Sequence, residues 1–286
     1  MSRGIDHLVL ATRDLKSASD LYEQLGFTLT PQAQHPFGTG NRLAQLEGEF
    51  LEIVSVTRAQ DLIEHQQGRF SFGAYNRDYL LSREGMSMIA LKSDGWRTDR
   101  QTFTDAGFAL PDPFTFSRKA RQPDGNEVTV GFDLTFVPDD QLPEALFFTC
   151  DHQHEARFFY KPEFQKHANG ALAVTGVFML ADDPANVSGI LTRLYGSDQG
   201  SEKAASQPIV LSAEQLHRRF PGHGEVVLRG GAVFAGYRIQ VSDLEDTRNV
   251  LATNGVAFAD KGQCLWLTAL GAIIEFSASP KGGNLQ

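Results

Sequence analysis

Short apolar runs alternate with amphipathic stretches along the chain, and the same order returns several times. The segment "GIDHLVLATRDLKSASDLYEQLGF" at residues 4–27 begins with an apolar run typical of a buried strand. An Asp-containing turn follows, then about ten residues with helical spacing, and Gly26 ends the pattern. The β-rich runs "NRLAQLEG" and "EFLEIVSV" come next, separated by turn residues. Together these features predict a β-α-β-β-β unit.

Three later segments repeat this plan: "MSMIALKSDGWRTDRQTFTDAGF", "VTGVFMLADDPANVSGILTRLYG" and "AGYRIQVSDLEDTRNVLATNGV". The last is the closest copy, because Asp243 and Gly255 match Asp14 and Gly26. One such unit would leave a sheet face exposed, so we expect the units to pair. The sequence therefore predicts an α+β fold of four β-α-β-β-β units, forming two paired modules with cup-shaped mixed sheets.

Two segments, residues 57–84 and 151–173, do not fit the repeat and are interpreted as connectors. The segment 151–173 divides the chain into two predicted modules. We expect an N-terminal module over residues 1–150 that holds the pocket, a connector over 151–173, and a more degenerate C-terminal module over 174–286. The sequence leaves open which units pair. A first-with-second and a first-with-fourth arrangement would each close a cup.

Composition narrows the classes of partner. The 286 residues contain neither the roughly 18 consecutive apolar residues of a membrane span nor a secretory-signal pattern, so a cytoplasmic protein without a membrane is expected. A net charge of −9 without clustered cations argues against nucleic-acid binding. The two cysteines, Cys150 and Cys264, form no disulfide framework or zinc motif. A small-molecule substrate or ligand is the expected partner, and a homodimer is left open.

His7 in the first apolar run, "HPFGTGNRLAQL" at residues 35–46 and Glu52 in "FLEIVSV" carry a family resemblance. The chain resembles the glyoxalase-like domain proteins of the vicinal oxygen chelate superfamily. In that superfamily, paired units form a cup that binds a divalent metal through a His or Gln on the first strand and a Glu on the last. The resemblance implies a metal-dependent lyase, isomerase or dioxygenase acting on a small oxygenated molecule. The alternative is a metal-free member that binds or sequesters one.

The metal ligands carry over only in part. His7 and Glu52 match the family positions, and imidazole with carboxylate suits Zn, Ni, Fe or Mn. A third ligand is needed; the candidate is His154 in "CDHQH", or Glu275 if the first unit pairs with the fourth. The strand-one positions of the other three units hold residues that cannot bind such an ion, namely Met88, Val177 and Gly236.

Without a metal, His7 and Glu52 can still act as an acid–base pair, because a carboxylate orients an imidazole and adjusts its pKa. A purely structural pair is the third reading. Both functional readings require the two side chains on adjacent strands, on the same concave face, within about 5 Å. His7 and Glu52 are therefore the candidate catalytic residues.

Two further segments supply candidate substrate contacts. The resemblance places the loop "HPFGTGNRL" over the mouth of the cup, which makes His35, Asn41 and Arg42 candidates; a plain Gly-rich β-turn is the alternative. Because this loop precedes a strand rather than a helix, no nucleotide cofactor is expected. In "SRKARQPDG", an inward-pointing arginine, for which Arg121 is the candidate, could clamp a carboxylate. A solvated strand edge is the alternative.

Overall fold

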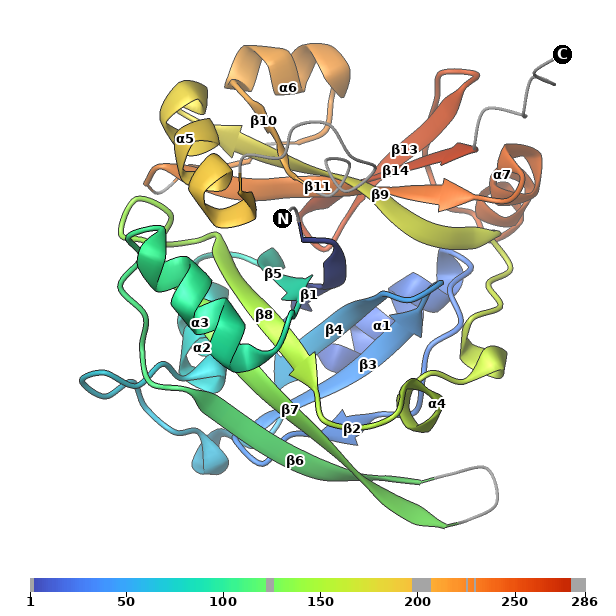
Figure 1. Cartoon of the computed structure of the whole chain (residues 1–286). Helices are drawn as coiled ribbons and strands as arrows, with labels where there is room; N and C mark the ends of the chain where they lie inside the picture. The colour runs from blue at the N-terminus through green and yellow to red at the C-terminus, as the bar shows by residue number, and fades with distance from the viewer. Residues whose placement is uncertain (1–2, 122–125, 197–206, 225, 229, 279–286) are drawn as a thin grey trace, which may run out of the picture.

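The chain folds around two curled β-sheets (Figure 1). The computed structural model describes residues 3–121, 126–196, 207–224, 226–228 and 230–278. The first half of the chain supplies an eight-stranded sheet, and the second half supplies a six-stranded sheet. A helix follows the first strand of each unit, and two units share each sheet. This arrangement confirms the predicted α+β fold with paired modules.

The first sheet has the strand order β2-β3-β4-β1-β5-β8-β7-β6. At its centre β1 (Ile5–Ala11) runs antiparallel to β5 (Gly85–Lys92). Each is flanked by the last strand of its own unit in parallel: β4 (Phe50–Val56) beside β1, and β8 (Leu146–His152) beside β5. The outer strands are β2 (Ala33–Gln34), β3 (Thr39–Gln45), β6 (Phe114–Arg121) and β7 (Glu127–Val137). The first unit thus pairs with the second, and the first-with-fourth alternative is not the arrangement found.

The second sheet has the order β10-β9-β11-β14-β13-β12. Its strands are β9 (Ala171–Ala181), β10 (Ile209–Leu211), β11 (Ala232–Val241), β12 (Ala259–Asp260), β13 (Cys264–Ala269) and β14 (Ala272–Ala278). The fourth unit has its full set of strands. The third is shorter: in its described part, β10 is followed by α6 (Ala213–Arg219) and a glycine-rich segment before β11 begins.

Each unit contributes one helix after its first strand. These are α1 (Leu15–Gln24), α3 (Trp96–Asp105), α5 (Pro184–Tyr195) and α7 (Leu244–Thr253). Asp14 begins α1 by accepting hydrogen bonds from the backbone N–H groups of Lys16 and Ser17, which have no partner inside the helix. Gly26 follows α1 with φ of 91°, a conformation that favours glycine. The helix boundaries predicted from Asp14 and Gly26 are confirmed.

The two segments outside the repeat contain short elements. Residues 57–84 hold η1 (Ala59–Asp61) and the eleven-residue helix α2 (Phe72–Ser82). The sequence pattern missed α2 because its buried positions include Gly73 and Asn76, which blur an apolar stripe. Residues 151–173 hold α4 (Ala156–Phe159) and η2 (Pro162–Phe164), between the ends of β8 and β9.

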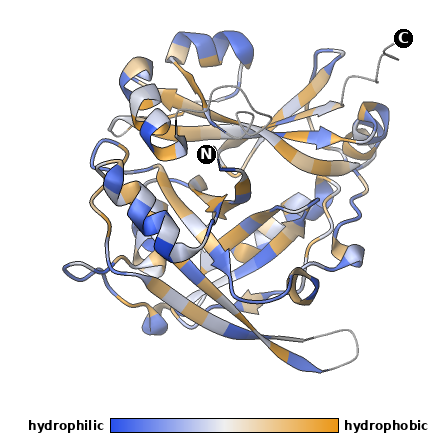
Figure 2. Cartoon of the chain, in the orientation of Figure 1, coloured by the Kyte–Doolittle hydropathy of each residue, from blue (hydrophilic) through white to orange (hydrophobic). Residues whose placement is uncertain are grey.

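The helix-bearing faces of both sheets share one hydrophobic core. Phe147 of β8 meets Phe234 of β11 with ring centroids 5.3 Å apart, and the buried hydroxyls of Tyr22 and Tyr237 lie 2.7 Å apart. The opposite, concave face of the first sheet has its own core, which α2 covers. In Figure 2 the outer surface of α6 is largely hydrophilic, whereas the strands beneath carry long apolar stretches. Among the described residues, no helix has the length and apolar character needed to cross a membrane.

Candidate functional site

His7 lies on β1 and faces the concave side of the first sheet, as do Val9 and Ala11. Its ring stacks on Phe50 of β4, with centroids 4.3 Å apart, and meets the edge of Phe148. The side chain is almost fully buried. Two aromatic rings therefore fix the imidazole in one orientation.

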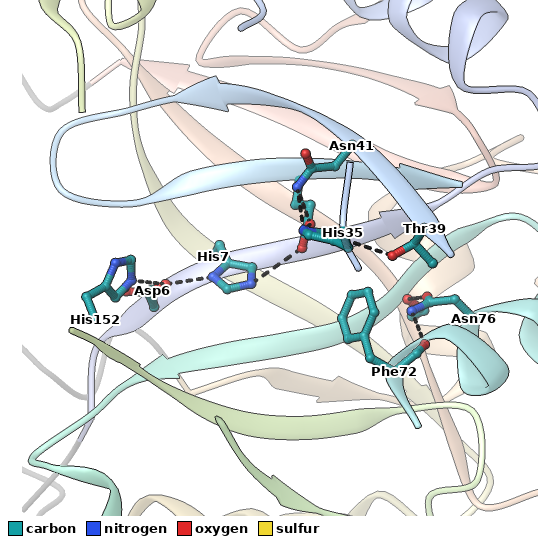
Figure 3. A network of polar contacts seen from close by, with 10 residues as sticks. Asp6, His7, His35, Thr39, Asn41, Phe72, Asn76 and His152 are labelled. Carbon is teal, nitrogen blue, oxygen red and sulfur yellow. Dashed lines mark hydrogen bonds and ion pairs between the residues drawn. The ribbon is translucent and has the colours of Figure 1, made fainter. Parts of the chain in front are cut away.

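Glu52 lies on the neighbouring strand β4, two residues beyond Phe50 and on the same face. The distance between Nε2 of His7 and Oε2 of Glu52 is 3.6 Å (Figure 3). Both side chains are about 95% shielded, with exposures of 5% each. The structure thus brings these two residues together on adjacent strands, within the distance expected from the sequence.

Asp6 and His152 extend the pair in the other direction. Oδ1 of Asp6 lies 2.6 Å from Nδ1 of His7, and Nε2 of His152 lies 3.1 Å from Oδ2 of Asp6. Burial alone would raise the pKa of Asp6, but the hydrogen bonds to His152 and His7 outweigh it and lower the pKa to about 2. An ionised Asp6 can only accept hydrogen bonds, so Nδ1 of His7 is the donor and Nε2 faces Glu52.

His35 and Asn41 complete the network on the far side of Glu52 (Figure 3). The Asn41 amide nitrogen donates to Oε1 of Glu52 at 2.6 Å and lies 3.3 Å from Nε2 of His35. Nδ1 of His35 is 2.8 Å from the hydroxyl oxygen of Thr39. Burial lowers the pKa of His35 to about 4, against the opposing influence of Glu52. His35 is therefore neutral near pH 7.

The arginine candidates are arranged differently from the prediction. Arg42 extends from β3 to the backbone oxygen of Thr30 and to Glu23 of α1, so the structure does not bring it to this network. The side chain of Arg121 lies outside the described residues. Arg118, three residues earlier on β6, lines the cavity beside Glu52.

The proposed third metal ligands also lie elsewhere. Nδ1 of His154 contacts the backbone oxygen of Gly131 at 3.1 Å, and the ring packs on Phe132. Glu275 lies on β14 of the second sheet, where it pairs with Arg219 at 3.0 Å and with Arg238. Neither residue joins His7 and Glu52.

The network borders a small cavity lined largely by phenylalanine rings from the sheet, α2 and α4. The polar lining consists of His7, His35, Asn41, Glu52 and Arg118, and Cys150 lies nearby. The cavity measures about 40 Å³, room for roughly three waters at 10–15 Å³ each. Phe72 at the start of α2 forms one wall. The site is therefore a cluster of polar side chains in a mainly apolar cavity, the usual layout for recognition of a small molecule.

The residues present do not fit a metal at the position that the superfamily resemblance implies. In the first unit His7 pairs with Phe50 and Val9 with Glu52; in the second, Met88 pairs with Leu146 and Ala90 with Phe148. The paired unit therefore presents Met88 and Phe148 where two ligands would be needed. His35 does not replace them: its Nε2 lies 3.8 Å from Oε1 of Glu52, but among the described residues only Asp6, His7 and Cys150 bring three such ligand atoms within 4.8 Å of one another.

A different trio could hold a metal ion. Asp6, His7 and Cys150 each offer one ligand atom, and these atoms lie within 4.8 Å of one another. Burial raises the pKa of the Cys150 thiol well above its usual value, which favours the neutral thiol. The 2.6 Å contact between Asp6 and His7 is a hydrogen-bond distance, shorter than the separation of two ligands on one ion, each about 2.0–2.2 Å from it.

Sequence reasoning missed Asp6 as a member of the site. It considered His152 and Arg118 in the same two segments but took His154 and Arg121 as the candidates. Asp6 precedes His7 directly, and strict alternation along a strand would place the two on opposite faces. The pairing register of β1 with β5 shifts between Ile5 and His7, so alternation fails at this point. Only the position of Asp6 beside His7 could have signalled the contact.

The paired units and curled first sheet define a fold of the vicinal oxygen chelate superfamily. A family model described as "Glyoxalase-like domain" matches residues 5–195. The chain belongs to this family of glyoxalase-like domain proteins. No curated protein sequence matches the chain.

Several solved structures share the fold over nearly the whole chain. A hypothetical protein from Staphylococcus aureus is 11% identical, with a TM-score of 0.67 and coverage of 97% of this chain and 100% of that one. A mutant 4-hydroxymandelate synthase from Streptomyces coelicolor is 10% identical, with a TM-score of 0.55 and coverage of 98% and 95%. The 2,2',3-trihydroxybiphenyl 1,2-dioxygenase from Sphingomonas wittichii is 8% identical, with a TM-score of 0.53 and coverage of 98% and 91%. At such identities the likeness extends to the fold alone.

Proposed function

We propose that the chain binds a small oxygenated molecule and catalyses a metal-independent proton transfer on it, as an isomerase or lyase would. The observation that carries this proposal is the row of acid and base groups that runs from the partly exposed His152 through the buried Asp6 and His7 to the buried Glu52. Such groups are costly to bury unless they satisfy one another or a ligand. Their arrangement beside a cavity favours general acid–base chemistry.

Glu52 is the proposed base. Its carboxylate takes a proton from a carbon next to a carbonyl group of the ligand, and the electron pair of the broken C–H bond moves onto the carbonyl oxygen. After exchange with solvent through the network, a proton is delivered to that carbon, to a neighbouring carbon or to a leaving group, so the reaction needs no oxidant. His7 lies 3.6 Å from Glu52 and shares the proton through Nε2, while Asp6 holds Nδ1. Asp6 and Asn41 act as positioning residues.

The surroundings of the network support a ligand with a small apolar group, because phenylalanine rings line most of a cavity that measures only about 40 Å³. Two fold neighbours are named after hydroxylated aromatic compounds, 4-hydroxymandelate and trihydroxybiphenyl. We further propose that the protein acts in the cytoplasm on small molecules, rather than on nucleic acid or membranes, in line with its net charge of −9.

Solvent exchange tests this proposal. The metal-stripped protein is incubated in D₂O with pyruvate, 2-oxobutyrate and lactate, and proton NMR follows the loss of the signal next to the carbonyl or carboxyl carbon. We expect exchange of at least one probe above the buffer rate, and a fall of roughly a hundredfold or more in Glu52→Gln. Exchange that appears only after metal is restored would contradict the proposal, as would the absence of exchange for every probe.

A second candidate is a divalent metal, Zn, Ni, Fe or Mn, held by Asp6, His7 and Cys150, because their ligand atoms lie within 4.8 Å of one another. The Asp6–His7 hydrogen bond would have to open to admit the ion. This candidate predicts about one equivalent of metal in the purified untagged protein, lost in both Asp6→Asn and Cys150→Ser. The metal-independent proposal predicts less than a tenth of an equivalent in all three proteins.

A further inference from the structure

A groove of about 450 Å³ adjoins the cavity on one side. Its walls come from residues 30–45, from β6 and from the connector between β8 and β9, so it runs where the two edges of the curled first sheet approach each other. Asn41, Leu43, Arg118 and Phe159 line both the groove and the cavity. These four side chains form the partition between the enclosed site and the surface.

The groove is positively charged. Arg118, Lys119 and Lys161 line it, and no acidic side chain does. A second groove on the other side of the cavity has Glu64 and Asp112 in its walls beside a single arginine. In a chain with a net charge of −9, a cationic groove at one entrance attracts anions selectively.

Arg118 differs from the other cations of the groove. Lys119 is paired with Glu127 at 2.8 Å and is exposed. Arg118 points into the partition and has no hydrogen-bond or ion-pair partner within the part of the chain that the structure describes. Burial lowers the pKa of Arg118, which shows the cost of holding this charge away from water. A bidentate anion would offset that cost.

We infer that the ligand of the site is a small carboxylate with an apolar body, and that Arg118 holds its carboxylate at the partition while the apolar part enters the phenylalanine-lined cavity. This inference rests on the proposed function, because it uses the same cavity. A carboxylate matches the planar fork of the guanidinium. In this position, the carbon next to the carboxylate of the ligand faces Glu52, on the cavity side of Arg118.

Paired probes test the inference. Acetate and acetamide, propionate and propionamide, and isobutyrate and isobutyramide have the same shape in pairs and differ in charge. Binding is measured by ligand-observed NMR titration. We expect at least one carboxylate to bind more tightly than its amide, and Arg118→Gln to weaken the carboxylate roughly ten- to a hundredfold while leaving the amide unchanged. Lys119→Gln removes the same charge on the adjacent residue and should weaken binding less than threefold.

Stability separates a ligand-binding role from a structural one. Because Arg118 forms no hydrogen bond or close ion pair among the described residues, and its attraction to Glu52 does not offset its burial, Arg118→Gln should unfold at or above the temperature of the wild type. A lower unfolding temperature, or equal affinity for every carboxylate and its amide, would overturn the inference. Failure of the proposed function would look different: carboxylates would still bind through Arg118, but Glu52→Gln would leave solvent exchange unaffected.

Discussion

Asp6 sets the chemistry of His7 at the scale of single residues. The ionised carboxylate accepts from Nδ1, which leaves Nε2 toward Glu52, and the second oxygen of Asp6 reaches His152, whose side chain is 21% exposed. A route for protons thus leads from a partly exposed histidine to a buried carboxylate. The two carboxylates, Asp6 and Glu52, thus lie on either side of the His7 imidazole and orient it.

His35 gives a prediction about pH. Its pKa is about 4 when folded and near 6.5 when unfolded. Between these values the unfolded chain binds a proton that the folded chain does not, so the free energy of unfolding falls as the pH drops from 6.5 to 4. His35 contributes about 3 kcal/mol to this fall in the free energy of unfolding. In His35→Gln the free energy of unfolding should therefore fall less between pH 6.5 and 4 than in the wild type. Chemical denaturation at several pH values measures this difference.

The exposed His217 on α6 provides the control for this experiment. His217→Gln should keep the slope of the wild type. Equal slopes for His35→Gln and wild type would mean that His35 takes up its proton normally in the folded protein. The buried Glu49, whose pKa is raised to about 7 by burial, contributes a slope of opposite sign, but it is common to all variants.

At the scale of elements, α2 determines how large the cavity is. The helix covers the concave face, and Phe72 at its start touches His35 edge-on, with centroids 6.0 Å apart. Ser71 begins the helix by accepting from the backbone N–H of Ala74. Without α2 the concave face would be open, as the cup expected from the resemblance would be.

Phe72→Ala should enlarge the cavity and lower the free energy of unfolding by about 3 kcal/mol, because a buried phenylalanine is replaced by space. Urea denaturation measures this change. Leu81→Ala on the same helix should have almost no effect, since Leu81 is 81% exposed. A similar loss in both variants would contradict this account, because Leu81 is exposed and alanine is the better helix former at both positions.

Elements differ in how far they could be predicted from the sequence. The helices α1 and α7 have clear apolar spacing, an Asp at the start and Gly after the end, so their existence and position followed from pattern alone. His7 and Glu52 could be paired through the family resemblance, which implies a ligand on the first strand and another on the last strand of a unit. Asp6 could not, since the register shift breaks alternation there. Arg118 lines the cavity because of the register of β6, which the sequence does not fix.

At the scale of the whole molecule, the two modules share one core. We propose that they divide as expected, with residues 1–150 and 174–286 joined by 151–173. The connector is held to the first module: His167 accepts from the backbone N–H of Thr28, and Asn169 donates to the backbone oxygen of Leu25. Since the helix-bearing faces pack directly on each other, we expect the chain to unfold in one transition.

The hydroxyl pair of Tyr22 and Tyr237 probes this interface between modules. Tyr22→Phe or Tyr237→Phe alone leaves one buried hydroxyl without its partner and should cost about 1–2 kcal/mol. The double variant removes both hydroxyls and should be close to the wild type. Calorimetry of the four proteins gives the coupling. Additive losses, or two separate transitions, would contradict a shared core.

The second module contains a natural comparison for the site. In the second sheet Gly236 pairs with Ile273 and Arg238 with Glu275, the same register as His7 with Phe50 and Val9 with Glu52. Glu275 therefore occupies the position of Glu52, yet Arg219 and Arg238 neutralise it. One module holds its buried carboxylate for structure, and the other places it beside a cavity.

The measurement that tests the account most directly is the thermal unfolding of Glu52→Gln beside that of Glu275→Gln. If Glu52 is held for function, its near-isosteric amide relieves the cost of a buried charge, and the unfolding temperature should stay within about 2 °C of the wild type or rise. Glu275→Gln breaks a structural ion pair with partly exposed arginines and should lose about 2 kcal/mol, lowering the temperature by several degrees. A fall for Glu52→Gln as large as that for Glu275→Gln would mean that His7 and Glu52 are scaffold.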